Sequence, residues 1–237
     1  MKKFYALALA IILVSTFAVG TALADGRTIS VTGTATIRVA PTIVNVYLGV
    51  TQTESTIQAA QDKTNKAIQK VVKALTKAGV AEEDIVTSSY TVYAEYNYNY
   101  QDGSQSFKGF TANCQITVIV REVDKAGALI DAAFAAGANQ LNNFEFSILD
   151  TAASQAKALQ LAVQDASSKA AILADAAGVK LGAIQSVTET GSGLNVYANG
   201  GISDTLKAEG DAGSGTQLQP GMLNVVSNVT LVYEITG

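Results

Sequence analysis

Five tyrosines at close spacing, just before an Asp-Gly turn at Asp102, are the residues of this chain that most resemble a site. They are Tyr90, Tyr93, Tyr96, Tyr98 and Tyr100. A row of exposed rings could stack on sugars or pack against a neighbouring subunit, because tyrosine joins a large apolar ring to a polar tip. The competing interpretation is that tyrosine simply suits strand positions. Four of the five share one parity and Tyr93 has the other, so we expect at least one face to be sheltered.

Five lysines at helical spacing form a second candidate surface. They are Lys63, Lys66, Lys70, Lys73 and Lys77, and Asp62 is the only acid between residues 55 and 81. Such a stripe suits an anionic partner, a lipid surface or an acidic face of another subunit. The alternative is an ordinary solvated helix face. The predicted interaction surface comprises Tyr93, Tyr96, Tyr98, Tyr100, Lys66, Lys70 and Lys73.

The chain is poor in catalytic residue types. It has no histidine and a single cysteine, which excludes Ser-His-Asp and Cys-His systems and any intramolecular disulfide. Cys114 lies on the apolar parity of a strand pattern, so we expect a buried small hydrophobe and not a redox sensor, which needs exposure and a lowered pKa. The acidic run 82–84 follows a helix end, and we expect it to cap the next turn. We therefore expect no catalytic, cofactor-binding or metal-binding residues.

The N-terminus has the pattern of a secretory signal peptide. Lys2 and Lys3 precede an apolar run over 4–19, and Ala22-Leu23-Ala24 gives a small-x-small cleavage signal. We expect a leader over 1–24 and a mature chain from Asp25, with a retained anchor as the alternative. The cut removes two of 16 basic residues, which leaves 14 against 20 acidic, a net charge of −6. An acidic exported chain is a poor nucleic-acid binder, and no second apolar stretch approaches spanning length.

Hydrophobic periodicity predicts the elements that carry these residues. Strands over 29–39 and 44–50 are expected to form a hairpin around Pro41. A helix with a capping box of Ser55 and Gln58 is expected to end at Gly79. The remaining elements are a hairpin of 86–98 and 107–121, a helix over 124–136 capped by Asp124, a strand over 144–149, a helix from Asp150 to Ala177, a strand over 181–190, a flexible loop over 191–221 and a strand over 223–235. This order predicts an α+β fold with mainly antiparallel sheets and three helices, in one domain over 25–237 that could form two lobes.

The order and spacing of several short segments resemble the SIMPL domain family, also called DUF541, which includes bacterial periplasmic oxidative-stress defence proteins and 26 kDa periplasmic immunogenic proteins. The segments cover about 28–236. They include Ile29-Ser-Val-Thr-Gly33, Val39-Ala-Pro41, Ala78-Gly-Val80, Glu82-Glu-Asp-Ile85, Thr87-Ser-Ser-Tyr90, Gly137-Ala-Asn-Gln140, Phe146-Ser147, Asp165-Ala166, Lys169-Ala170 and Gly178-Val-Lys-Leu-Gly182. The resemblance implies an envelope protein with a tendency to oligomerise and without agreed catalytic residues.

Three functions follow as hypotheses. The first is a non-enzymatic exported protein, periplasmic or secreted, that acts through homo-oligomeric assembly or binding. Its part in oxidative-stress defence is implied by the resemblance alone. The second is a cell-wall or small-ligand binding module that uses the tyrosine hairpin. The third is a carboxylate-based hydrolase, which needs two acids that converge in a cleft.

Overall fold

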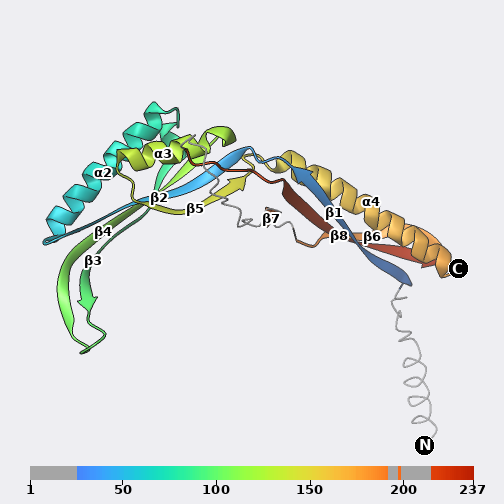
Figure 1. The fold of residues 1–237 in the computed structure, drawn as a ribbon. Coiled ribbons are helices and arrows are strands. Elements are labelled where there is room, and N and C mark those ends of the chain that lie inside the picture. Colours follow the sequence, from blue (N-terminus) through green and yellow to red (C-terminus); the bar gives the residue numbers. More distant parts are fainter. Residues whose placement is uncertain (1–25, 192–196, 199–214) are drawn as a thin grey trace, which may run out of the picture. The chain divides into compact units, whose positions relative to one another are not determined.

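The computed structural model describes residues 26–191, 197–198 and 215–237. These residues form an α+β fold with three helices and two antiparallel sheets (Figure 1), as the sequence predicts. Over the described residues, the chain divides into two compact units, one of residues 26–34, 161–191 and 228–237 and one of residues 35–160, 197–198 and 215–227. The predicted leader and most of the predicted loop 191–221 lie outside the described residues.

The larger unit contains a sheet in the order β3-β4-β2-β5. Its strands are β2 (Ile43–Glu54), β3 (Ile85–Tyr98), β4 (Gln105–Val120) and β5 (Gln140–Ser147). The central strand β2 pairs antiparallel with β4 from Val44 opposite Val120 to Glu54 opposite Phe110. The predicted hairpin of β3 and β4 is confirmed.

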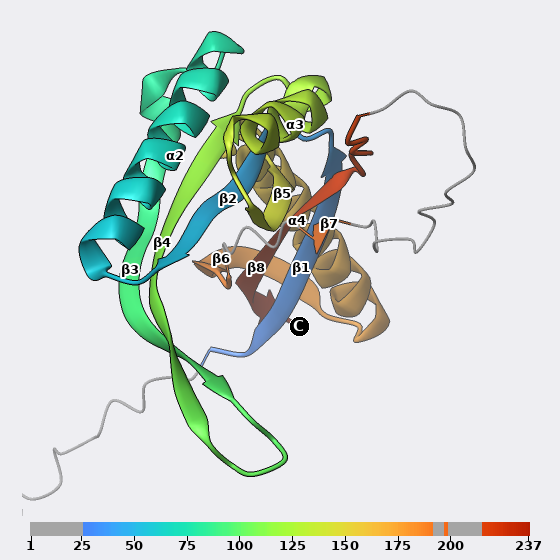
Figure 2. The same cartoon turned by 60° about the vertical axis from the view of Figure 1, so that its left-hand side comes forward.

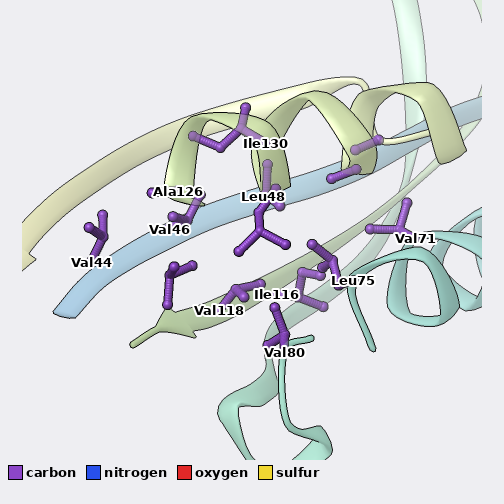
Figure 3. Packing of buried hydrophobic residues seen from close by; sticks show 14 of the residues in the cluster. Val44, Val46, Leu48, Val71, Leu75, Val80, Ile116, Val118, Ala126 and Ile130 are labelled. Atoms are coloured by element: carbon purple, nitrogen blue, oxygen red, sulfur yellow. The ribbon is translucent and has the colours of Figure 1, made fainter. Parts of the chain in front are cut away.

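Helices α2 (Ile57–Lys77) and α3 (Ala126–Ala136) pack with this sheet around one hydrophobic core. Alternate residues of β2 and β4, among them Leu48 and Ile116, are buried against Leu75 of α2 and Ile130 of α3 (Figure 3). Full burial of such side chains stabilises the fold by about 1.5–3 kcal/mol each. The apolar face of the strands, which repeats every two residues, and the apolar face of α2, which repeats every 3.6 residues, therefore pack together in this core.

The two helix starts differ from the prediction by local geometry. Helix α2 is capped by Thr56, whose Oγ1 accepts from the Ala59 N–H at 3.2 Å, and not by Ser55. Gln58 then stands one position too early for a capping box and donates to Asp62 instead. Asp124 makes no cap, because a 3₁₀ turn over Val123–Lys125 precedes α3.

The second sheet has the order β1-β8-β6, formed by β1 (Thr28–Val39), β8 (Leu223–Thr236) and β6 (Lys180–Glu189), and the short β7 (Tyr197–Ala198) also pairs with β8. Helix α4 (Ala152–Ala176) approaches β1 closely at Gly33. A Cβ on Gly33 would lie 2.0 Å from the Ala162 carbonyl oxygen. Alanines at intervals of four residues, including Ala162 and Ala166, are fully buried on α4. Small residues on both sides thus bring the strand against the helix backbone.

The predicted hairpin of the first two strands is wrong. β1 pairs with β8 in one sheet, whereas β2 pairs with β4 and β5 in the other. Alternating apolar residues indicate a strand but do not select its neighbour. The chain passes from one sheet to the other at residues 40–42, where Pro41 has no N–H and the Thr42 N–H donates to the Ser147 carbonyl.

Among the described residues, no helix combines the length and the apolar character that a membrane crossing requires.

Candidate functional site

The hairpin of β3 and β4 is longer than the sheet that supports it. β2 ends at Glu54 opposite Phe110. From Tyr96 opposite Phe107 to Tyr98 opposite Gln105, β3 and β4 therefore pair only with each other among the strands that the structure describes. This two-stranded end extends past the start of α2 (Figure 2). We call residues 96–107 the arm. Its turn is closed at Asp102, whose Oδ1 accepts from the Ser104 N–H, and at Gly103, which has φ 73°.

All five tyrosines of the run are exposed. The exposed fraction is lowest at Tyr90, at 40%, and highest at Tyr100, at 92%. The arm carries Tyr96, Tyr98 and Tyr100, and the described residues cover none of them fully. Even Tyr90, which lies opposite the buried Cys114, is only partly covered.

Aromatic contacts order the rings on the arm. Tyr96 and Phe107 meet edge to face with centroids 5.7 Å apart, and Phe107 meets Phe110 in the same way at 5.2 Å. Tyr98 and Tyr100 form a second edge-to-face pair at 5.0 Å. Phe107 is 51% exposed and belongs to the surface, although the sequence analysis did not single it out. Phe107 is recognised as part of this surface by the pairing of β3 with β4, which places it opposite Tyr96.

The tyrosines occupy two faces, as their parity predicts. Tyr90 lies opposite Cys114, on the core side of the sheet, and burial raises the pKa of its hydroxyl. Tyr93 lies opposite Thr111, on the other side. Directly paired residues share a face of the sheet, so the rings do not form one flat platform.

Glu95 fastens the arm to the sheet. Its Oε1 accepts from Lys108 Nζ at 2.6 Å, and its Oε2 accepts from Thr111 and, at 3.2 Å, from Thr53. These hydrogen bonds, that from Lys108 first, lower the pKa of the Glu95 carboxyl. A bulge between Glu95 and Tyr96 brings Gly109 to φ 156°, where an added Cβ would lie 2.6 Å from the Glu54 carbonyl oxygen.

The lysine stripe lies on the exposed side of α2. Lys63 forms an ion pair with Glu54. Lys66, Lys70 and Lys73 are exposed, and within the described parts of the chain they take part in no ion pair. The structure therefore leaves their charge facing solvent, which fits both an anionic partner and an ordinary wet surface.

Cys114 is a core residue, as predicted. It is 3% exposed, and burial raises the pKa of its thiol. A thiol in this environment is a poor nucleophile.

The acidic run after α2 does not cap a turn, which corrects the prediction. Asp84 is buried, and its two oxygens accept from Arg121 Nε at 2.6 Å and from Nη2 at 2.8 Å. Sequence reasoning missed this pair because 37 residues separate the partners. The Arg121 side chain lowers the pKa of the Asp84 carboxyl.

The carboxyl groups whose pKa is shifted do not suit the role of a general acid. Asp84, Glu95, Asp131 and Asp165 each accept hydrogen bonds that lower their pKa. A general acid near neutral pH needs the opposite displacement. Over residues 26–191, 197–198 and 215–237, no group of three or more carboxylate or thiol side chains is placed to hold a metal ion.

Comparison with known proteins gives a consistent family. The model of the family described as "SIMPL: Protein of unknown function (DUF541)" matches residues 29–233. The "26 kDa periplasmic immunogenic protein" of Brucella melitensis biotype 1 is 31% identical over 166 residues, 68% of this chain and 66% of the relative. The "Uncharacterized protein YggE" of Escherichia coli K12 is 29% identical over 165 residues, 70% of this chain and 66% of the relative.

A protein of the same name from Edwardsiella ictaluri is 28% identical over 163 residues, 69% of this chain and 68% of the relative. The aligned part thus spans about two thirds of each relative, and none of the three names states an enzymatic activity. Because the family model covers nearly all the strands and helices described above, the chain belongs to the SIMPL family of proteins of unknown function.

Proposed function

We propose that this protein is a non-enzymatic, exported envelope protein that acts through homo-oligomeric assembly, with the arm as its main contact surface. The observation that supports the proposal is the exposure of Tyr96, Tyr98 and Tyr100 on a ribbon of only two strands. A two-stranded hairpin is marginally stable in water by itself. Packing of its rings against a neighbouring subunit would stabilise the arm and bury its apolar surface together.

The proposed place of action is the periplasm, or the exterior in a host without an outer membrane. One relative carries the word periplasmic in its name, and the leader pattern of residues 1–24 agrees with export. We extend the proposal to a part in oxidative-stress defence, which the family resemblance implies. Because Cys114 is buried, that part would not run through a reactive thiol of this chain.

The lysine stripe has a secondary role in this proposal. Lys66, Lys70 and Lys73 would face an acidic surface of a neighbouring subunit or an anionic envelope surface. Exposed ion pairs contribute about 0–1 kcal/mol each, whereas buried aromatic residues dominate the affinity of most interfaces. The arm should therefore supply most of the affinity and the stripe should mainly set orientation and association rate.

The experiment compares two triple variants of the exported chain by sedimentation. Replacing Tyr96, Tyr98 and Tyr100 by Ser should dissociate the assembly at micromolar concentration. Replacing Lys66, Lys70 and Lys73 by Gln should leave most of it intact at 0.15 M salt. Equal loss in both variants, or none in the first, would contradict the proposed role of the arm.

A second candidate function is binding of a sugar or another small ligand. It is favoured by the Tyr98–Tyr100 pair, whose second ring is 92% exposed and open to stacking. The oligomeric state of the wild-type chain distinguishes the two candidate functions. A chain that stays monomeric and shows quenching of tyrosine fluorescence by cell-wall glycan fragments would support this second candidate.

A further inference from the structure

Strand β3 is the end strand of its sheet. It pairs with β4 on one side from Ile85 to Tyr98, and within the described residues no strand lies along its other side. The N–H and C=O groups on that outer side are therefore open to another strand. Natural proteins usually block such an edge by making it short or by placing Lys or Pro on it.

The edge of β3 lacks most of these protections. The strand has 14 residues without a lysine, arginine or proline. Its single charge is on Glu95, and that carboxylate is held by Lys108 and Thr111 of the neighbouring strand. At the opposite edge of the sheet, β5 has eight residues and an exposed Glu145.

Two bulges divide β3 and define the part that can pair regularly. The register shifts between Thr87 and Ser89 and again between Glu95 and Tyr96. Between them Ser89–Glu95 pairs with β4 without interruption. This run of regular backbone is centred on Val92.

The exposed area fits a second copy of this chain as the occupant. The five tyrosines are between 40% and 92% exposed, which corresponds to roughly 400–700 Å² of ring surface at 150–250 Å² per side chain. A stable interface buries about 800 Å² on each partner. The rings and the backbone edge together come near this value, whereas a short peptide on the edge would leave the arm exposed.

We propose that β3 pairs antiparallel with β3 of a second copy, about a twofold axis at Val92, so that two four-stranded sheets become one. This inference rests on the proposed assembly and assigns its contact. Val92 is the middle residue of Ser89–Glu95, so only an axis at Val92 lets all seven residues pair with the same run of the second copy. Each large ring then faces a small residue, with Tyr90 opposite Ala94 of the partner subunit and Tyr93 opposite Thr91 of the partner subunit. Glu95 faces Ser89 of the partner subunit, so no like charges are opposed.

Cysteine cross-linking tests the contact and its register. Val92→Cys is introduced in a Cys114→Ala background of the exported chain, which is then treated with a mild oxidant. Directly opposite residues of antiparallel strands have Cα atoms about 4.5–5.5 Å apart, within the span of a disulfide. Val92→Cys should therefore form a covalent dimer at least tenfold faster than the controls. Ala94→Cys is the register control, because its two copies would lie about 14 Å apart, and the exposed Asn143→Cys on β5 is the edge control.

A charge on the edge provides a second measurement without any cross-link. Thr91→Lys adds a charge to an exposed position beside the proposed axis, and it should raise the dissociation constant of the pair at least tenfold. Asn143→Lys should leave that constant within twofold. Circular dichroism establishes that each variant is folded.

The outcomes separate this inference from the proposed function. A wild-type oligomer that resists Thr91→Lys, or that cross-links through Asn143→Cys as fast as through Val92→Cys, overturns β3 pairing and leaves assembly intact. Faster linkage through Ala94→Cys than through Val92→Cys overturns the register. A monomeric wild-type chain overturns both, and β3 would then be an edge for a strand of a different protein.

Discussion

At the residue scale, burial and partners decide what each chemically interesting side chain can do. Cys114 carries a thiol, but it is buried in the core of the sheet opposite Tyr90. Asp84 belongs to an acidic run by sequence but is a buried acceptor of Arg121 in the fold. Neither residue is arranged for chemistry on a substrate.

Replacing Cys114 by Ala should lower the free energy of unfolding by about 1 kcal/mol, because a small buried volume is lost. Urea unfolding monitored by circular dichroism measures this change. The native wild-type thiol should react with a soluble thiol reagent only on unfolding, because burial raises its pKa. Fast labelling of the folded chain would show that Cys114 is accessible and would reopen a redox role.

Replacing Asp84 by Asn should lower the free energy of unfolding at pH 7 by about 1–2 kcal/mol, since Asp84 is buried but Arg121 is half exposed. The Asp84 pKa is lowered in the folded state. The stabilisation is therefore present above the unfolded-state pKa of about 4 and is lost as the pH falls through the lower folded-state value. Urea midpoints at pH 7 and pH 3 should show a difference from wild type that shrinks in acid.

Glu122→Gln, in an exposed pair with Lys125, is the control, and it should hardly change the free energy of unfolding. A difference that stays constant with pH would contradict this account.

At the element scale, the close contact of Gly33 in β1 with α4 makes the sharpest prediction. Gly33→Ala would bring a Cβ to 2.0 Å from the Ala162 carbonyl and 2.5 Å from the Ala166 backbone nitrogen. Strand and helix must separate, so we expect a loss of about 1–3 kcal/mol, typical of overpacking. Gly26→Ala, whose nearest atom would be 3.4 Å away, is the matched control. Thermal unfolding of both variants checks the prediction, and equal melting temperatures would count against the contact.

Sequence patterns predicted the helices and strands themselves better than they predicted which strands pair. The order of strands and helices, the β3–β4 hairpin and the glycine end of α2 follow from local periodicity and turn residues, and the structure confirms them. The β1–β2 hairpin was wrong because alternation does not encode pairing, and Asp84–Arg121 was missed because the two residues are far apart in sequence. For the candidate site, the tyrosines and their two faces were predictable from parity. Phe107 and the free length of the arm were not, because both depend on where β2 ends.

At the scale of the whole molecule, the claim is that this SIMPL-family chain works as an assembly and not as an isolated enzyme. The exposed arm, the unprotected edge of β3 and the solvent-facing lysines of α2 all offer surface to a neighbour. A closed symmetric oligomer is the usual way to cover such surfaces. The lysine stripe on α2 would then mainly orient the subunits. Salt should therefore have only a modest effect on the assembled state.

The most direct test of this claim is the mass of the mature chain in solution. Sedimentation velocity at 1–50 μM in 0.15 M salt, together with native mass spectrometry, gives that mass without any variant. The account predicts a discrete species whose mass is an integer multiple, two or more, of the chain's mass and which persists to low micromolar concentration. A single monomeric species across the whole range would contradict it.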